Sequence, residues 1–511
     1  SYIGYVSQQI KVGTQSSIHV ILKEDTQTLD EVVVTALGIK RAEKALSYNV
    51  QQVNTDAVTE HKDANFVNSL NGKVAGVTIN ASSSGVGGVS KVVMRGTKSI
   101  MQSSNALYVV DGVPMFAGSS KGGGKEFDSQ GATEPIADIN PDDIESISVL
   151  KDAASAAIYG AEAGNGVVLI TTKKGKAGQG KITYDFQWTT QSLARIPKMM
   201  NSEQYIDYMV ESETYTQDYL LRNWDGVTNT SWSDEIFENS QMQKHNIAFS
   251  NGNEKGNYYL SLTYLDNNGI VKGDADVYKR LTATINGEYE IKPWLKVGTT
   301  NQIEKYNSRT VSTNNEYGSM LASILQADPL TPFSYTYEEL PSHMLKAMNE
   351  GKHLLDDGNG NYYSVSKFLG GESYHPIIMR DNNANKNSGF NVNGSIYADF
   401  KPIKDITITS RFGYRLSGTR QSNTDLPFYG NATQSRDFVS HNATSSTSIY
   451  YQWENFANYM RRFGMHTVTG MVGMSYQEST YDYVNGSLSA NGEDALSLIH
   501  ISEPTRRSYI S

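Results

Sequence analysis

The sequence predicts a mixed fold, in which an α+β domain is followed by an incomplete transmembrane antiparallel β-barrel, with the end of a small β-sandwich at the N-terminus. Two observations lead to this prediction. Nine segments after residue 180 alternate apolar and polar residues with a period of two, as half-buried strands do. The connections between these segments are alternately short and long, which is typical of membrane barrels with short periplasmic turns and long outer loops.

The nine alternating segments carry the barrel prediction. In the third of them, Tyr258, Leu260 and Leu262 share one face, and Ser261 and Thr263 share the other. A soluble β-sandwich has no reason to alternate its loop lengths, so we prefer the barrel and keep the sandwich as the alternative. The predicted strands span residues 181–192, 242–252, 256–266, 277–291, 294–306, 388–400, 405–417, 447–461 and 464–478. The longer connections are residues 193–241, 267–276, 307–387 and 418–446.

The composition excludes several other classes of protein. The 511 residues include 32 Tyr and 44 Gly but no Cys, and the net charge is -10. The negative charge argues against a nucleic-acid partner, and the lack of Cys excludes disulfides and thiolate metal sites. The mean hydropathy of -0.46 is compatible with a membrane barrel, because polar lumen-facing residues dilute the apolar ones. No apolar run reaches 18 residues, so we predict no transmembrane helix.

Residues 38–177 predict the compact α+β domain. The dipeptide Asp111-Gly112 is a strong turn signal between two β-branched stretches. We expect a helix over 63–77, a helix start at 141–145 and a helical turn over 152–159. The expected strands are residues 92–94, 106–110 and 167–172.

Several ordered motifs resemble the SusC/RagA-like family of TonB-dependent outer-membrane receptors, and the resemblance covers residues 1 to about 494. The stretch that resembles the family's TonB box consists of Asp30, Glu31, Val32, Val33, Val34, Thr35 and Ala36. The stretches that resemble its plug signature include Arg95, Gly96, Thr97, Asp111, Gly112, Pro114, Asn165 and Gly166, which we expect to have structural roles.

The resemblance implies a division of the chain into five parts. Residues 1–24 would end a carboxypeptidase-regulatory-like β-sandwich, and 25–37 would be a linker with the TonB box. Residues 38–177 would form a plug domain, and 178–494 the first roughly nine strands of the barrel. The last part, 495–511, looks like a translated sequencing adapter, and we exclude it from the fold prediction.

The resemblance also implies a function. The expected activity is TonB-dependent import of a glycan or peptide oligomer across the outer membrane of a Gram-negative bacterium. The expected partners are TonB with its energising inner-membrane complex, a SusD-like surface lipoprotein, and outer-membrane lipid. We expect no enzymatic activity, no cofactor and no metal site, because the sequence shows no nucleophile elbow and no His- or Cys-based ligand spacing.

Two other interpretations stay open at this point. The first is a soluble β-protein that binds or cleaves carbohydrate. The second is that this stretch alone has no function, because the family barrel has about 22 strands and nine strands cannot close it. No signal peptide opens the sequence, so we expect its first residue to lie inside a longer protein. Open strand edges favour aggregation, so we expect the isolated chain to be insoluble.

Overall fold

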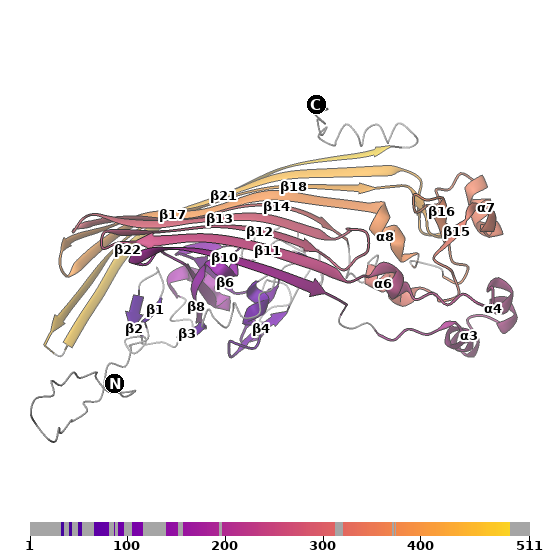
Figure 1. The fold of residues 1–511 in the computed structure, drawn as a ribbon, viewed down its shortest axis with the longest axis horizontal. Coiled ribbons are helices and arrows are strands. Elements are labelled where there is room, and N and C mark those ends of the chain that lie inside the picture. The colour runs from indigo at the N-terminus through magenta and orange to yellow at the C-terminus, as the bar shows by residue number, and fades with distance from the viewer. Residues whose placement is uncertain are drawn as a thin grey trace, which may run out of the picture.

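The structure is a computed structural model in which a curved sheet arches over a small α+β domain, with the helices of the longer connections gathered at one end of the sheet (Figure 1). The predicted β-sandwich end at 1–24 and the adapter-like tail at 495–511 lie outside the described residues. The structure describes residues 32–34, 40–42, 50–53, 66–80, 86, 90–96, 105–115, 139–151, 157–193, 197–311, 320–369, 373, 375–464 and 466–490.

All nine predicted barrel segments form strands, and every neighbouring pair in their sheet is antiparallel. The order in the sheet follows the order in the chain. Among the described residues, β10 and β22 do not pair with one another, so this part of the chain forms an open sheet. The strands are β10 (Gly178–Gln191), β11 (Ser240–Gly252), β12 (Gly256–Asn268), β13 (Val277–Lys292), β14 (Leu295–Thr310), β17 (Asn383–Ile403), β18 (Ile406–Asp425), β21 (Val439–Phe463) and β22 (His466–Ala490).

The last four strands are longer than predicted. Most of the expected long connection at 418–446 is strand, and only 426–438 remains between β18 and β21. Some of the added stretches, such as Arg420–Thr424 of β18, are polar on both faces and therefore show no apolar alternation. Backbone pairing alone extends these strands, and hydropathy does not record it.

The two faces of the sheet have opposite chemistry. Along β12, Tyr258, Leu260 and Leu262 are exposed on the convex face, whereas Ser261 and Thr263 are buried on the concave face. The same alternation continues along β11, β13 and β14. An exposed apolar face opposite a polar buried face is the pattern of a membrane barrel wall, whose outer side contacts lipid.

The α+β domain is built on a five-stranded sheet in the order β3-β8-β9-β6-β7, in which only β6 and β9 are parallel. A second sheet pairs β4 with β5. The predicted strands at 92–94, 106–110 and 167–172 are confirmed. The strands are β3 (Val50–Val53), β4 (Val77–Asn80), β5 (Lys91–Met94), β6 (Leu107–Val110), β7 (Val113–Met115), β8 (Ile144–Leu150) and β9 (Val167–Thr172).

Where the structure describes the predicted helices of this domain, they are short 3-10 helices. The helix expected over 63–77 is a 3-10 helix, η3 (Phe66–Leu70), followed by turns in which Gly72 and Gly76 have positive φ. A glycine in this conformation ends a helix. The expected start at 141–145 is a single 3-10 turn, η5 (Pro141–Asp143), that leads into β8. The Ala-rich stretch 152–159 is described only from 157, where η6 (Ala157–Asn165) begins.

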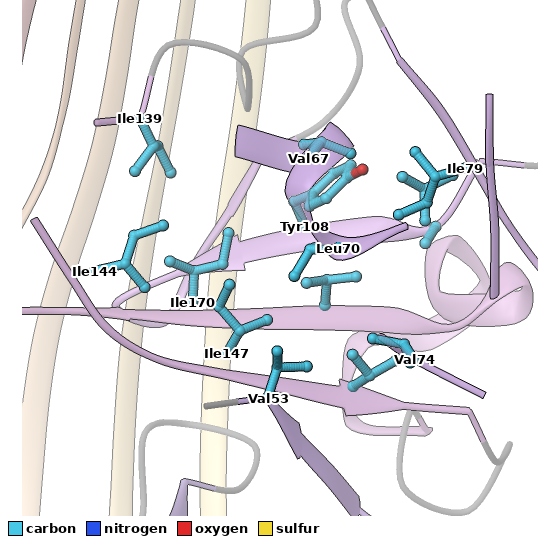
Figure 2. Close-up of a cluster of buried hydrophobic side chains, with 14 of the residues drawn as sticks. Val53, Val67, Leu70, Val74, Ile79, Tyr108, Ile139, Ile144, Ile147 and Ile170 are labelled. Atoms are coloured by element: carbon cyan, nitrogen blue, oxygen red, sulfur yellow. The ribbon is translucent and has the colours of Figure 1, made fainter. Parts of the chain in front are cut away.

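An apolar cluster between η3 and the five-stranded sheet stabilises this domain. Val67 and Leu70 of η3 pack against Ile147 of β8 and Ile170 of β9, and all four side chains are buried (Figure 2). Because the cluster lies between η3 and the five-stranded sheet, it keeps the domain compact.

The longer connections fold into helices and short hairpins at one end of the large sheet (Figure 1). None of the described helices is long and apolar enough to cross a membrane. The connection 192–239 contains α3 (Ser202–Glu211), α4 (Gln217–Asn223) and α5 (Trp232–Ile236). The connection 311–382 contains α6 (Met320–Gln326), β15 (Ser334–Thr336), η7 (Tyr337–Glu339), α7 (Ser342–Asn349), β16 (Asn361–Tyr363) and α8 (Pro376–Asn382), and 426–438 contains β19 (Phe428–Tyr429) and β20 (Ser435–Arg436).

Candidate functional site: the contact between the α+β domain and the sheet

Asp143 is the centre of the contact between the small domain and the concave face of the sheet. It is almost fully buried at the end of η5. Its carboxylate accepts hydrogen bonds from three wall hydroxyls, those of Tyr259 (2.8 Å), Ser261 (2.8 Å) and Thr284 (2.7 Å). Hydrogen bonds to a charged group are the stronger kind, so this residue anchors the domain to β12 and β13.

The neighbouring residues of η5 extend this anchor. The Asp142 carboxylate forms an ion pair with Lys244 of β11 at 2.7 Å, and both side chains are close to fully buried. Asn140 donates to the hydroxyl of Thr263 on β12 at 2.8 Å. The segment 140–143 therefore contacts three consecutive strands of the wall through polar groups alone.

Asp111 and Gly112 form the turn between β6 and β7, as predicted, and both have positive φ. The Asp111 carboxylate accepts hydrogen bonds from the amide and the hydroxyl of Thr172 at 3.0 and 2.6 Å. Its removal from water raises the pKa of Asp111 above the ordinary value, although these hydrogen bonds and the nearby charges of Lys174 and Arg411 act in the opposite direction.

This turn also meets the wall. The side-chain amide of Gln452 on β21 donates to the Gly112 carbonyl at 2.9 Å, and Asn286 on β13 donates to Thr172 and to the Lys173 carbonyl. A Cβ on Gly112 would collide with the guanidinium of Arg411 on β18. The turn therefore needs glycine both for its φ and for the close approach of the wall.

Lys174 closes the contact where the chain passes from the small domain into β10. Its ammonium lies 3.2 Å from the Glu288 carboxylate and 3.1 Å from the Tyr397 hydroxyl. Glu288 also pairs with Lys296 at 2.9 Å. The small domain thus occupies the concave face of the sheet and is held there by hydrogen bonds and ion pairs from several strands.

Comparison with known proteins shows what this arrangement is. Residues 42–167 match the family model described as the TonB-dependent Receptor Plug Domain. The chain is 32% identical over 338 residues to the TonB-dependent receptor SusC of Bacteroides thetaiotaomicron, a match that covers 65% of this chain and 31% of SusC. It is 28% identical over 495 residues to the TonB-dependent receptor P39 of Formosa agariphila, covering 94% of this chain and 42% of that protein.

A solved structure has the same fold. The RagAB peptide importer in its open-open state superposes with a TM-score of 0.72 at 24% identity, over 93% of this chain and 52% of that one. The chain belongs to the SusC/RagA-like TonB-dependent receptors. It spans less than half of the length of SusC and P39. The α+β domain is the receptor's plug, and the large sheet is part of its barrel wall.

The predicted TonB box is only partly described. Val32–Val34 form β1, which pairs antiparallel with β2 (Lys40–Ala42), whereas Asp30, Glu31, Thr35 and Ala36 lie outside the described residues. In Figure 1, β1 and β2 lie towards the end of the sheet that is opposite the helical loops. The three-residue pairing shows that this segment adopts the extended backbone that strand addition requires.

The predicted plug-signature residues have different surroundings. Arg95 and Gly96 form an exposed turn after β5 in which both have positive φ, and Thr97 lies outside the described residues. Pro114 is buried in β7, whereas Asn165 at the end of η6 is partly exposed. Gly166 has positive φ, and a Cβ there would collide with Met94. Among the predicted site residues that the structure describes, Asp111 and Gly112 form the turn that lies against the wall.

Several residues of the contact were not predicted, chiefly Asp142, Asp143, Lys244, Asn286 and Gln452. The only signal in the sequence was that the strands carry amide, hydroxyl and charged side chains at the positions opposite their apolar face. The aromatic residues of the wall differ in exposure: Tyr259 and Tyr450 are buried. Trp294 and Trp453 are exposed.

The outer loops form one folded body, which we call the outer-loop unit: the described residues of the connections 192–239, 269–276, 311–382 and 426–438. Each of the four contributes to one apolar cluster, with Trp232, Val271, Ile324 and Phe428 as examples. The Trp232 indole also donates to the Asp328 carbonyl at 2.7 Å. The four connections therefore pack around a shared core and form one structural unit.

His375 lies in the core of the outer-loop unit. Its Nε2 donates to the Phe333 carbonyl at 2.9 Å, and its Nδ1 accepts from the Ile377 amide at 3.1 Å, so the ring is neutral. The rings of Trp232, Phe333 and Tyr363 surround it. Burial lowers the pKa of His375 to about 4.

This depressed pKa predicts a pH dependence. The unfolded chain binds the proton near the ordinary pKa of about 6.5. The neutral ring's contribution to stability is therefore complete above pH 6.5 and is lost as the pH falls towards 4, by at most about 3 kcal/mol. Hydrogen exchange in 320–369 should accelerate over this range, and His375→Phe should flatten the dependence. An equally steep dependence in the variant would contradict the assignment.

Proposed function

We propose that this chain forms the plug, residues 38–177, and the first strands of the wall, within 178–494, of an energy-coupled importer of the Gram-negative outer membrane. TonB binds the segment 30–36 and transmits force from its inner-membrane complex to the plug. A SusD-like surface lipoprotein delivers a glycan or peptide oligomer to the outer loops. These steps follow the expectation from the motifs, and the geometry supports them.

The observation that carries this proposal is the polar contact between the plug and the concave wall. The plug lies where a solute would pass, so transport requires that the plug moves. Asp143, Asp142 and Gln452 hold it through hydrogen bonds and an ion pair that water can replace. Such a contact separates at less cost than an apolar core, because each polar group regains water as it leaves.

The exposed apolar face argues against the soluble alternative. Leu262, Ile285 and Ile396 are about half exposed on the convex side, together with the aromatic side chains beside them. A soluble carbohydrate-binding or carbohydrate-cleaving protein rarely exposes a continuous apolar surface of this extent. A lipid-facing wall requires such a surface.

The outer-loop unit supports the substrate part of the proposal. A hollow of about 660 Å³ lies between the loops and is lined by aromatic, Met and amide side chains, among them Tyr208, Met199 and Asn229. Such a lining can contact the apolar faces and the hydrogen-bonding groups of an oligomer. RagAB, which shares the fold, is described as a peptide importer. Among the loop tyrosines, Tyr337 is exposed and could stack on a sugar ring, whereas Tyr363 is buried in the loop core.

The test is the removal of residues 30–36 from the full-length receptor. We expect energised uptake of the substrate to be lost, while the amount of receptor in the outer membrane is unchanged. A matched pair sharpens the test: Val33→Pro removes a backbone N–H that strand addition needs, whereas Val33→Thr keeps it. Loss of uptake in the proline variant alone supports the proposal, and normal uptake after the deletion would refute it.

A further inference from the structure

We propose that a hollow in the lipid-facing surface of the wall binds one acyl chain of a phospholipid from the periplasmic leaflet. The hollow has a volume of about 670 Å³ and is lined by residues of β11, β12, β13, β14 and β17. The inference rests on the proposed outer-membrane placement of the receptor but not on the identity of its substrate or on TonB. It can therefore fail while the importer proposal stands.

The strand register explains why the wall is hollow at this place. One row of side chains on the convex face runs across the sheet through Asn251, Tyr258, Gly287, Thr299 and Ile396, each paired with the next. In this row, Gly287 carries no side chain and its neighbour Thr299 carries a small one. The positions on either side carry large side chains, and a gap is left between them.

The large side chains that line the hollow are chiefly aromatic and aliphatic, beside polar residues such as Asn251 and Asn257. Tyr258, Tyr289 and Ile396 line it and are 47%, 52% and 56% exposed, respectively. A Cβ built on Gly287 would meet only the Asn257 carbonyl, at 3.6 Å, which is ordinary contact. The space above Gly287 is therefore open, and a larger side chain could occupy it without displacing the backbone.

The position of the hollow selects its ligand. It lies beside the short turns at 253–255 and 293–294, and short turns mark the periplasmic end of an outer-membrane barrel. The molecules that touch the convex face at this depth are lipid chains. Exposed Lys255 and Lys292 stand at the same end together with exposed Glu254 and Glu290, so this end offers a partner for both the phosphate and the ammonium of a zwitterionic head group. The acyl chain of a phospholipid with a zwitterionic head group is therefore the occupant that this lining and these charges fit.

The experiment uses the full-length receptor in nanodiscs that contain a phosphatidylethanolamine with a diazirine on its acyl chain. After photolysis, we expect the peptides that carry Tyr258 and Tyr289 to be labelled severalfold more than those from the rest of the convex face. Gly287→Leu should fill the hollow and reduce this labelling to the level of the other lipid-facing peptides.

Ala283→Leu is the matched control, because Ala283 lies on the same strand and the same face, four residues from Gly287 and outside the hollow. It should leave the labelling at Tyr258 and Tyr289 unchanged. Uptake should be normal in both variants, since neither residue faces the plug. Uniform labelling of the convex face, or equal labelling in wild type and Gly287→Leu, would overturn the proposal. Preferential recovery of lipopolysaccharide from the purified receptor at this site would also overturn it.

Discussion

Replacing Asp143 with alanine should weaken the contact between the plug and the wall more than any other single substitution at this contact. The substitution leaves the hydroxyls of Tyr259, Ser261 and Thr284 buried without their shared acceptor. Loss of a buried, charged hydrogen-bonding centre costs about 3–5 kcal/mol. In the full-length receptor, hydrogen exchange should accelerate in residues 139–151, and cells should admit large antibiotics that the outer membrane normally excludes.

Two controls separate this effect from general destabilisation. Asp143→Asn keeps the size of the side chain and one acceptor oxygen, so it should fall between wild type and alanine. Glu145→Gln changes another carboxylate of the same segment and should leave both exchange and permeability near the wild-type level. Faster exchange spread over the whole barrel, or none within 139–151, would contradict the anchoring role of Asp143.

Replacing Trp232 with alanine should destabilise the outer-loop unit as a whole. The indole is 6% exposed, packs edge-on against His375 at 4.7 Å between ring centres, and donates to the Asp328 carbonyl. Truncation of a buried Trp costs about 3–5 kcal/mol, and here a buried carbonyl also loses its donor. Because the core is shared, exchange should accelerate in 320–369 as well as in 197–239.

Tyr208→Ala provides the control for this prediction. Tyr208 lies on α3 in the same connection, but it is 53% exposed, so its removal should have little effect on stability. If Trp232→Ala accelerated exchange only in its own connection, the four connections would not behave as one body.

The strands of the wall could be predicted because lipid imposes a chemical pattern on them. Wherever one face contacts lipid and the other contacts the plug, apolar and polar residues alternate, and the segment 256–266 shows this in full. Beyond the lipid no such constraint acts, and the polar extension of β21 at 439–446 was therefore missed. The hydropathy pattern reports whether each face of a strand contacts lipid, protein or water, but it does not report the backbone hydrogen bonds of the strand.

In the plug, the sequence predicted one turn correctly but not the short helices or the anchoring residue. Its turn at Asp111-Gly112 was predictable, because two consecutive residues with positive φ demand these residue types. The short 3-10 helices were not, since Leu70 and Val74 follow a helical spacing while Gly72 and Gly76 end the helix. Asp143 was unpredictable as an anchor, because its three partners lie more than 100 residues away on two strands.

Disulfide cross-linking in living cells tests most directly whether TonB binds the segment around Val33 and acts through it on the plug. The chain contains no Cys, so a cysteine introduced at position 33 of the full-length receptor would be its sole thiol within this region. Paired with a cysteine-bearing TonB in living cells, it should form a disulfide that increases when substrate is present. Failure of position 33 to cross-link, in a receptor that is correctly inserted and active in uptake, would contradict the claim.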